Sequence, residues 1–201
     1  LRSLRGFSFP RKLMTTYTKL QAVNIVLSNI GQAPVTSLDS QNPMVQLANG
    51  MIEEVTNSVQ SEGWTFNTEH DYPFTPDTNG FITIPQNVIS LDGGWASDIE
   101  FVIRGGRLYD KRNHTYSWDQ QQKLVVVWLF PFEDMPVAMK NYVVVRAANL
   151  FAGRAVGNAE VVKYSEREEQ AARAALMEYE SQQGDYTFFQ DRQRRNNATS
   201  Y

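Results

Sequence analysis

Residues 18–35 read TKLQAVNIVLSNIGQAPV, and this stretch contains the signals for both ends of a helix. Thr18 and Gln21 have the spacing of a capping box, in which each side chain accepts a hydrogen bond from the backbone N–H of the other residue. Gly31 and Pro34 end the helix, and we expect Gly31 to adopt the left-handed conformation that glycine permits. The apolar residues between these signals follow at helical spacing: Leu20, Val23, Leu27 and Ile30.

A second helix is predicted a few residues further along the chain. Asn42 followed by Pro43 is a favourable pair for the N-cap and the first helical position. Gly63 marks the other end, so most of the residues between these signals are expected to be helical. The apolar residues expected on its buried face are Met44, Leu47, Met51, Val55 and Val59.

After the second helix the hydrophobic period changes to the short apolar segments typical of strands. Trp64 and Phe66 are the first aromatic residues of this region, and Pro-rich turns follow them. Gly105 and Gly106 predict a tight hairpin turn, because glycine readily adopts the positive φ that such a turn needs. We therefore expect residues 64–130 to form a β-rich insertion. Short strands are predicted at Phe81–Ile84, Ile99–Ile103, Arg107–Tyr109 and Leu124–Leu129.

Two further helices are predicted after the insertion. Asp134 and Pro136 open the third helix, whose apolar residues cover more than one face and indicate burial on several sides. The fourth extends over about Val161–Gln183 and contains an alanine cluster that lets helices approach closely. The pattern predicts an α+β fold in which a four-helix core, formed by residues 14–63 and 131–183, carries the β-rich insertion.

The two ends of the chain differ from this core in composition. Residues 1–13 contain four basic residues and no acidic residue, and Met14 follows them directly. A targeting arm and a basic arm that folds on a partner are two interpretations; the third, which we favour, is that Met14 is the native start. Residues 184–201 are polar and lack a periodic apolar pattern, which predicts either a flexible docking arm or a solvated terminus. The candidate anchors of this arm are Tyr186, Phe188, Phe189, Arg192, Arg194 and Arg195.

Composition excludes several classes of chemistry. The chain has no cysteine, so disulfides, thiolate nucleophiles and cysteine-based metal sites are excluded. The net charge of -3 argues against a surface that binds nucleic acid everywhere, and no apolar run is long enough to span a membrane. His70 and His114, both in predicted turns, have no histidine or cysteine at the spacings of metal ligands. We therefore predict no catalytic site, no metal and no cofactor.

The other candidate motifs have structural interpretations. Glu53 and Glu54 are neighbours on a helix and point in different directions, which suits acid–base catalysis poorly. Glu169 and Arg173 are expected to form an ion pair within one helix, because they lie four residues apart. The segment 153–157, GRAVG, lacks the ending of a nucleotide-binding loop and is interpreted as the end of the third helix.

Five segments in order along the chain resemble the tail tubular protein A family, the adaptor proteins of short-tailed, podovirus-type bacteriophages. The first joins LxAVN at 20–24 with IGQAPV at 30–35. The others are GWTFN at 63–67, RGGxxYD at 104–110, DMP at 134–136, and the closing helix with MEYE at 177–180. The resemblance covers about residues 18–189, and five motifs in order over that length are hard to obtain by chance.

This resemblance implies a non-enzymatic structural role. A member of the family is expected to form a dodecameric homo-oligomeric ring that binds the portal protein on one face and the tail nozzle protein on the other. DNA would pass through the channel during ejection without sequence-specific binding, and the arm at 184–201 would dock on the portal. The expected location is the head–tail junction of the virion, after assembly in the cytoplasm of the host bacterium, with no membrane involved.

Two other functions are compatible with parts of the sequence. A glycan-degrading enzyme of the tail would use acidic residues for catalysis and aromatic residues for sugar stacking, but the acids form no recognisable pair. A nucleic-acid-binding module would use the Arg-rich ends, and its affinity for DNA would fall steeply with salt.

Overall fold

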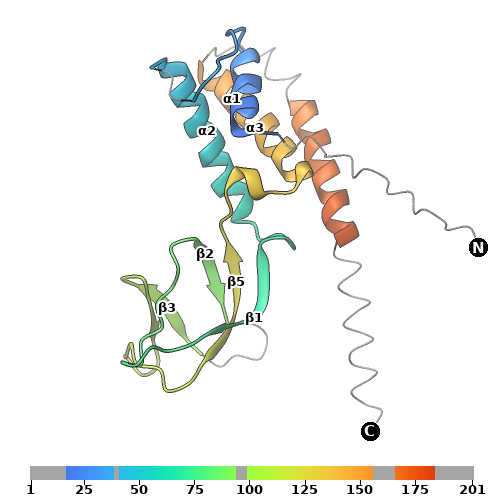
Figure 1. Cartoon of the computed structure of the whole chain (residues 1–201). Coiled ribbons are helices and arrows are strands. Elements are labelled where there is room, and N and C mark those ends of the chain that lie inside the picture. Colours follow the sequence, from blue (N-terminus) through green and yellow to red (C-terminus); the bar gives the residue numbers. More distant parts are fainter. Residues whose placement is uncertain (1–16, 39–40, 94–98, 156–165, 184–201) are drawn as a thin grey trace, which may run out of the picture.

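The computed structural model describes residues 17–38, 41–93, 99–155 and 166–183, and the structural statements below concern these residues. The helices gather at one end of the molecule and the strands at the other (Figure 1). The architecture is α+β, as the sequence predicts. In chain order the elements are α1 (Lys19–Ser28), α2 (Pro43–Gln60), β1 (Thr68–Phe74), β2 (Val88–Asp92), β3 (Phe101–Arg104), β4 (Arg107–Asp110), β5 (Gln122–Trp128), a 3-10 turn (Phe132–Asp134), α3 (Val137–Ala155) and a further helix at 166–183.

The ends of α1 form as the local sequence predicts. Thr18 N donates to Gln21 Oε1 at 3.0 Å and Gln21 N donates to Thr18 Oγ1 at 3.2 Å, which completes the capping box. At the other end Gly31 has a φ of +76°, and its N–H donates to Ser28 O. The next N–H, of Gln32, reaches back to Leu27 O at 3.0 Å, which is the second bond of a Schellman motif.

The start of α2 is also confirmed, and Met51, Val55 and Val59 of its predicted apolar face are buried. Asn42 Oδ1 accepts from Met44 N at 3.0 Å, and Pro43 occupies the first helical turn. Leu47, predicted to be buried, is 49% exposed, because α1 and α3 pack against a neighbouring stripe of the helix. The apolar members of that stripe are Val45, Ala48, Met51, Ile52, Val55 and Val59.

A single hydrophobic cluster joins α1, α2, α3 and the helix at 166–183. The last of these contributes Ala172 and Leu176, so both ends of the chain build the helical core. Trp64 belongs to this cluster, and Phe66 packs against it. These two residues lie in the turn between α2 and β1, so the aromatic pair placed at the start of the insertion covers the base of the helices instead.

A second cluster fills the β-rich part. Strands β1, β5 and β2 form an antiparallel sheet in that order, and β3 and β4 form a separate hairpin. The hairpin turn is as predicted, since Gly105 and Gly106 both have positive φ, at +58° and +72°. The cluster itself consists of Phe74, Ile82, Ile84, Leu108, Trp118, Leu124, Val126 and Trp128.

Several predicted strands differ from the observed ones. The strand predicted at Phe81–Ile84 is wrong: this segment makes only isolated bridges, because Phe81 pairs with Ser117 and Thr83 with Arg107 instead of facing one continuous partner. β1 and β2 were not predicted at all. His70, placed in a turn by the sequence, lies in β1 and is exposed, whereas His114 does lie in a turn.

The start of α3 requires a smaller correction. Asp134 lies in the 3-10 turn and does not open the helix; α3 begins at Val137, and Pro136 directly precedes it and accepts a hydrogen bond from Lys140 N. Lys140 is buried, and its Nζ donates to Glu133 O at 2.6 Å, which ties this turn to the helix. The described part of α3 ends at Ala155, inside the GRAVG segment, and residues 156–157 of that segment lie outside the described residues.

Substitutions of Gly31 and Gly50 are expected to change the stability of the protein in opposite directions. A Cβ on Gly31 would meet no atom within 4 Å, so Gly31→Val should cost only its left-handed backbone, roughly 1 to 2 kcal/mol of unfolding free energy. Gly50 lies inside α2 in open space, and Gly50→Ala should stabilise the protein by about 0.5 to 1 kcal/mol. Thermal and urea melts of both variants test this, and an unchanged midpoint for Gly31→Val would contradict the cap.

Candidate functional site

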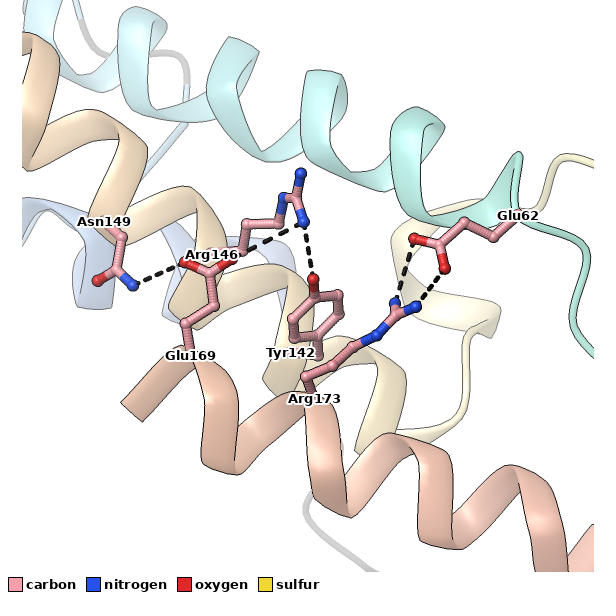
Figure 2. A network of polar contacts seen from close by, with 6 residues as sticks. All are labelled: Glu62, Tyr142, Arg146, Asn149, Glu169 and Arg173. Atoms are coloured by element: carbon pink, nitrogen blue, oxygen red, sulfur yellow. Dashed lines mark hydrogen bonds and ion pairs between the residues drawn. The ribbon is translucent and has the colours of Figure 1, made fainter. Parts of the chain in front are cut away.

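The most elaborate polar arrangement in the described residues holds the helix at 166–183 against α3 and the end of α2 (Figure 2). This helix leads towards residues 184–201, for which the sequence predicts either a docking arm or a solvated terminus. Residues 184–201 lie outside the described residues. The contacts at the base of the arm are therefore the part of this candidate site that the structure describes, and we call them the helix clamp: Glu62, Tyr142, Arg146, Asn149, Glu169 and Arg173.

One half of the helix clamp joins α3 to Glu169. Arg146 Nη1 lies 3.7 Å from Glu169 Oε1, and Asn149 Nδ2 donates to the other carboxylate oxygen at 3.0 Å. Arg146 Nη1 also donates to Tyr142 Oη at 2.8 Å, which fixes the guanidinium on the α3 side. The three α3 residues share one face because they are spaced by four and three positions.

The other half joins Arg173 to Glu62, just beyond the end of α2. The guanidinium is bidentate: Nη1 donates to Glu62 Oε1 at 3.1 Å and Nη2 to Oε2 at 2.5 Å. The hydrogen bonds to Glu62 raise the pKa of Arg173 despite the opposing effect of partial burial. The same guanidinium lies 5.0 Å from the ring of Trp64 and 5.2 Å from that of Tyr142, which adds a cation–π contact.

These contacts correct one prediction. Glu169 and Arg173 were expected to pair with each other along their own helix. Each instead binds a residue of another element, because both side chains face α3 and α2 across the helix packing and find better-placed partners there. The ion pairs therefore hold helices together and do not stabilise a single helix.

A further contact fastens the same helix to the turn that leads to the strands. Glu180 Oε1 accepts hydrogen bonds from Thr65 N and Thr65 Oγ1, both at 2.6 Å. Trp64, next to Thr65, is buried, and its indole N–H donates to Val59 O at 2.6 Å. The helix at 166–183 is thus attached to α3, to the end of α2 and to the junction with the β-rich part.

The junction itself depends on two buried amides. Gln60 exchanges two hydrogen bonds with the backbone of Phe130, from Nε2 to O and from N to Oε1, each at 2.9 Å. Asn67 Nδ2 donates to Gln60 O at 3.0 Å and to Trp128 O at 2.9 Å, while its Oδ1 accepts from Trp64 N. Both amides are fully buried, so they connect the chain leaving the helices to the chain returning from the strands.

A hollow of about 560 Å³ lies beside this junction, between α2 and the segment that follows β5. Its walls are partly apolar, with Ile52, Phe130 and Phe132, and carry the ion pair between Lys19 Nζ and Glu53 Oε1 at 2.6 Å. Within the described ranges no cluster of His, Asp and Glu side chains is arranged to hold a metal ion. The paired charges here do not provide a free acid and base for catalysis.

The residues singled out by the sequence do not converge on one place. Gly31 and Pro34 lie at and after the end of α1, Gly105 and Gly106 at the tip of the β3–β4 hairpin, and Pro136 before α3. Among these described residues only Trp64 touches the helix clamp, to which Glu169 and Arg173, singled out as an ion pair, also belong. The contacts of Glu62, Arg146 and Glu180 were not predicted from the sequence. The spacing of Glu169, Arg173, Leu176 and Glu180, alternately four and three positions, was the available signal for a helix face that packs on other helices.

Comparison with known proteins defines the class of this chain as a structural component of a bacteriophage tail. A family model described as tail tubular protein matches residues 20–186, and the chain belongs to this family. Tail tubular protein A of Klebsiella phage KP34 is 28% identical over 166 residues, which cover 80% of this chain and 86% of that protein. The family resemblance found in the sequence is thereby confirmed. In the part of the chain that the structure describes, no helix is long and apolar enough to cross a membrane.

Substitutions of Glu62 and Arg173 in the helix clamp are expected to destabilise the protein unequally. Glu62 and Arg173 are 39% and 34% exposed, so their coupling in a double-mutant cycle should stay below about 1 kcal/mol. Arg173→Ala should lower the free energy of unfolding by about 1 to 2 kcal/mol. This loss should exceed that of Glu62→Ala, because Arg173→Ala also removes the contacts with Trp64 and Tyr142. Urea melts measure both, and Arg167→Ala, at an exposed position of the same helix, is the control. Equal losses from Arg173→Ala and Glu62→Ala would contradict the stacking contribution.

Proposed function

We propose that this chain is a subunit of the head–tail adaptor, a ring between the portal protein and the tail nozzle through which DNA leaves the capsid. The observation that carries the proposal is the family match over residues 20–186, together with an α+β fold in which both ends of the chain build one helical core. A dodecameric ring is the stoichiometry that the family resemblance implies. Assembly would take place in the host cytoplasm, and the protein would remain at the head–tail junction of the virion.

Exposed apolar side chains on the helices support a role in assembly. Several large hydrophobic residues lie on the outside of the helical core, where a monomer gains nothing from them. Contacts with other subunits, with the portal or with the nozzle would remove them from water. The side chains concerned and their exposed fractions are Leu47 at 49%, Met177 at 47%, Val137 at 40%, Ile25 at 37% and Leu150 at 37%.

The pairing of charges in the helical core supports the proposal that DNA slides through the ring. Four cationic side chains of this core each lie within 4 Å of a carboxylate: Lys19 with Glu53, Arg146 with Glu169, Arg154 with Glu54 and Arg173 with Glu62. The hydrogen bonds from Arg154 lower the pKa of Glu54, so this carboxylate stays charged and keeps its partner neutralised. A cation that is already paired with a carboxylate binds phosphate weakly and displaces few counterions from DNA. DNA that forms few strong phosphate contacts meets little resistance as it moves.

The requirement for a template gives one test of the adaptor role. The chain from Met14 onward should sediment as a folded monomer or weak oligomer by itself and form rings when portal protein is added, because an arm that orders on the portal couples assembly to portal binding. Analytical ultracentrifugation of the chain with and without portal measures this. Rings at micromolar concentration without portal would reject the templating step, whereas failure to bind portal at all would reject the adaptor role.

Deleting residues 184–201 tests the proposed arm. Removal of Tyr186, Phe188 and Phe189 should weaken portal binding by on the order of 1 to 3 kcal/mol per buried ring, less the cost of ordering the arm. The melting temperature should not change, because the polar sequence of residues 184–201 predicts an arm outside the helical core.

A shorter deletion, of residues 190–201, is the matched control. It keeps the three aromatic residues and removes Arg192, Arg194 and Arg195, so only the salt-sensitive part of the binding should be lost. Co-sedimentation with portal at low and at high salt compares the two deletions. If the chain without residues 184–201 binds portal as tightly as the full chain, the portal contact lies on the helical core.

A further inference from the structure

Unpaired positive charge is concentrated on the β3–β4 hairpin. We call residues 100–112 the basic hairpin; it carries four cationic side chains against two carboxylates, those of Glu100 and Asp110. All four cationic residues are exposed, and none makes an ion pair within the described residues, whereas the ion pairs that are present lie in the helical part. The cationic residues of the basic hairpin are Arg104, Arg107, Lys111 and Arg112.

Local contacts hold these charges in place. The Arg104 guanidinium lies 4.3 Å from the ring centroid of Tyr109, and that of Arg107 lies 4.5 Å from the ring of Phe81. Asp110 Oδ1 accepts from the N–H groups of Arg112 and Asn113 at 2.8 and 2.9 Å, which fixes the turn after β4. A surface whose charges are already ordered loses less conformational entropy when it binds a partner.

Exposed apolar surface accompanies the charge. Tyr116 is 37% exposed and packs edge-on against Tyr109, with ring centroids 4.8 Å apart, and Ile103 is 43% exposed. Tyrosine and arginine are the residues most often found at the energetic centre of protein interfaces. The composition of the basic hairpin is therefore that of a contact surface for another protein.

A surface of opposite charge lies on β1. Glu69 and Asp71 are exposed, no Lys or Arg occurs within Thr68–Phe74, and neither carboxylate makes an ion pair in the described part of the chain. We call residues 69–71 the acidic edge. In the order β1-β5-β2, β1 is an edge strand, and an irregular register between Glu69 and Tyr72 interrupts its pairing with β5. Asp71 has a φ of +55° at this irregularity.

The two surfaces lie on opposite sides of the β-rich part. In Figure 1, β1 forms one side of this part, and β3 lies beyond β2 at the other side. A subunit that repeats around a closed ring must present two different surfaces that fit each other, because its contacts are heterologous. A positive surface on one side and a negative surface on the other meet this requirement.

We propose that the basic hairpin of one subunit contacts the acidic edge of the next subunit around the ring. The inference rests on the proposed adaptor ring and names a contact within it. The observations favour a second copy over DNA, because the two carboxylates of the basic hairpin offset half of its positive charge and the whole chain has a net charge of -3. The same chain offers a matching negative surface on the opposite side.

Charge reversal with mixing tests the contact. The hairpin variant carries Arg104→Glu and Arg107→Glu; the edge variant carries Glu69→Lys and Asp71→Asn, because asparagine tolerates the positive φ at that position. Each variant alone should form about tenfold fewer portal-templated rings at low salt, since like charges then face each other. In an equal mixture every contact joins opposite charges again, so ring formation should return to within about threefold of the unmodified chain.

Three further measurements complete the experiment. Melting temperatures verify that the variants fold, and Lys111→Glu with Arg112→Glu replaces the first hairpin variant if the loss of stacking destabilises it. Arg167→Glu, on the helix at 166–183, is a control that should leave ring formation unchanged. Binding of a short DNA duplex to the hairpin variant is measured in parallel.

The outcomes separate this inference from the proposed function. Loss of rings in each single variant with recovery in the mixture supports the contact. Rings that persist in the hairpin variant overturn the contact. A loss of rings that mixing does not restore also overturns it and would assign the basic hairpin to portal binding. If DNA binding is lost in parallel, the basic hairpin would instead be assigned to DNA. An unmodified chain that forms no ring with portal overturns the adaptor role as well.

Discussion

Gln60 and Asn67 form the connection on which the arrangement of the two parts depends. The chain leaves the helical core after α2 and returns after β5, and these two amides bond both segments of backbone at that point. Both side chains are fully buried, so a replacement at either position would leave backbone groups of Trp128 or Phe130 without partners, at a cost of roughly 1 to 3 kcal/mol for each orphaned group. The orientation of the strands relative to the helices is therefore set by directional hydrogen bonds as well as by apolar packing.

The charged residues are divided between the helical part and the β-rich part. In the helical part, Lys19, Arg146, Arg154 and Arg173 pair with carboxylates from other segments and hold the helices together. In the β-rich part, the basic hairpin and the acidic edge have no such partners within the described residues. The paired charges of the helical core are neutralised there, whereas the unpaired charges on the β-rich part remain available to neighbouring molecules.

Many local features were predictable because each depends on a few adjacent residues. The capping box of Thr18 and Gln21, the left-handed Gly31 and the hairpin turn at Gly105 and Gly106 all formed as expected. The strands β1 and β2 were not predicted, because they depend on pairing with the distant strand β5. β1 reads TEHDYPF, with two acids and a proline, and only pairing with β5 makes this segment a strand.

The sequence by itself determined both ends of α1, the start of α2, the placement of a β-rich part between helices and, through motifs spread over its length, the family. Tertiary structure alone decided that Leu47 stays exposed, where Trp64 packs and with which residues Glu169 and Arg173 pair. Helix ends and tight turns are set by hydrogen bonds and φ preferences within a few residues, so their signals are local. Burial and ion pairing depend on which distant segments meet, and residues such as Glu62 and Arg173 become neighbours only after the helices have packed.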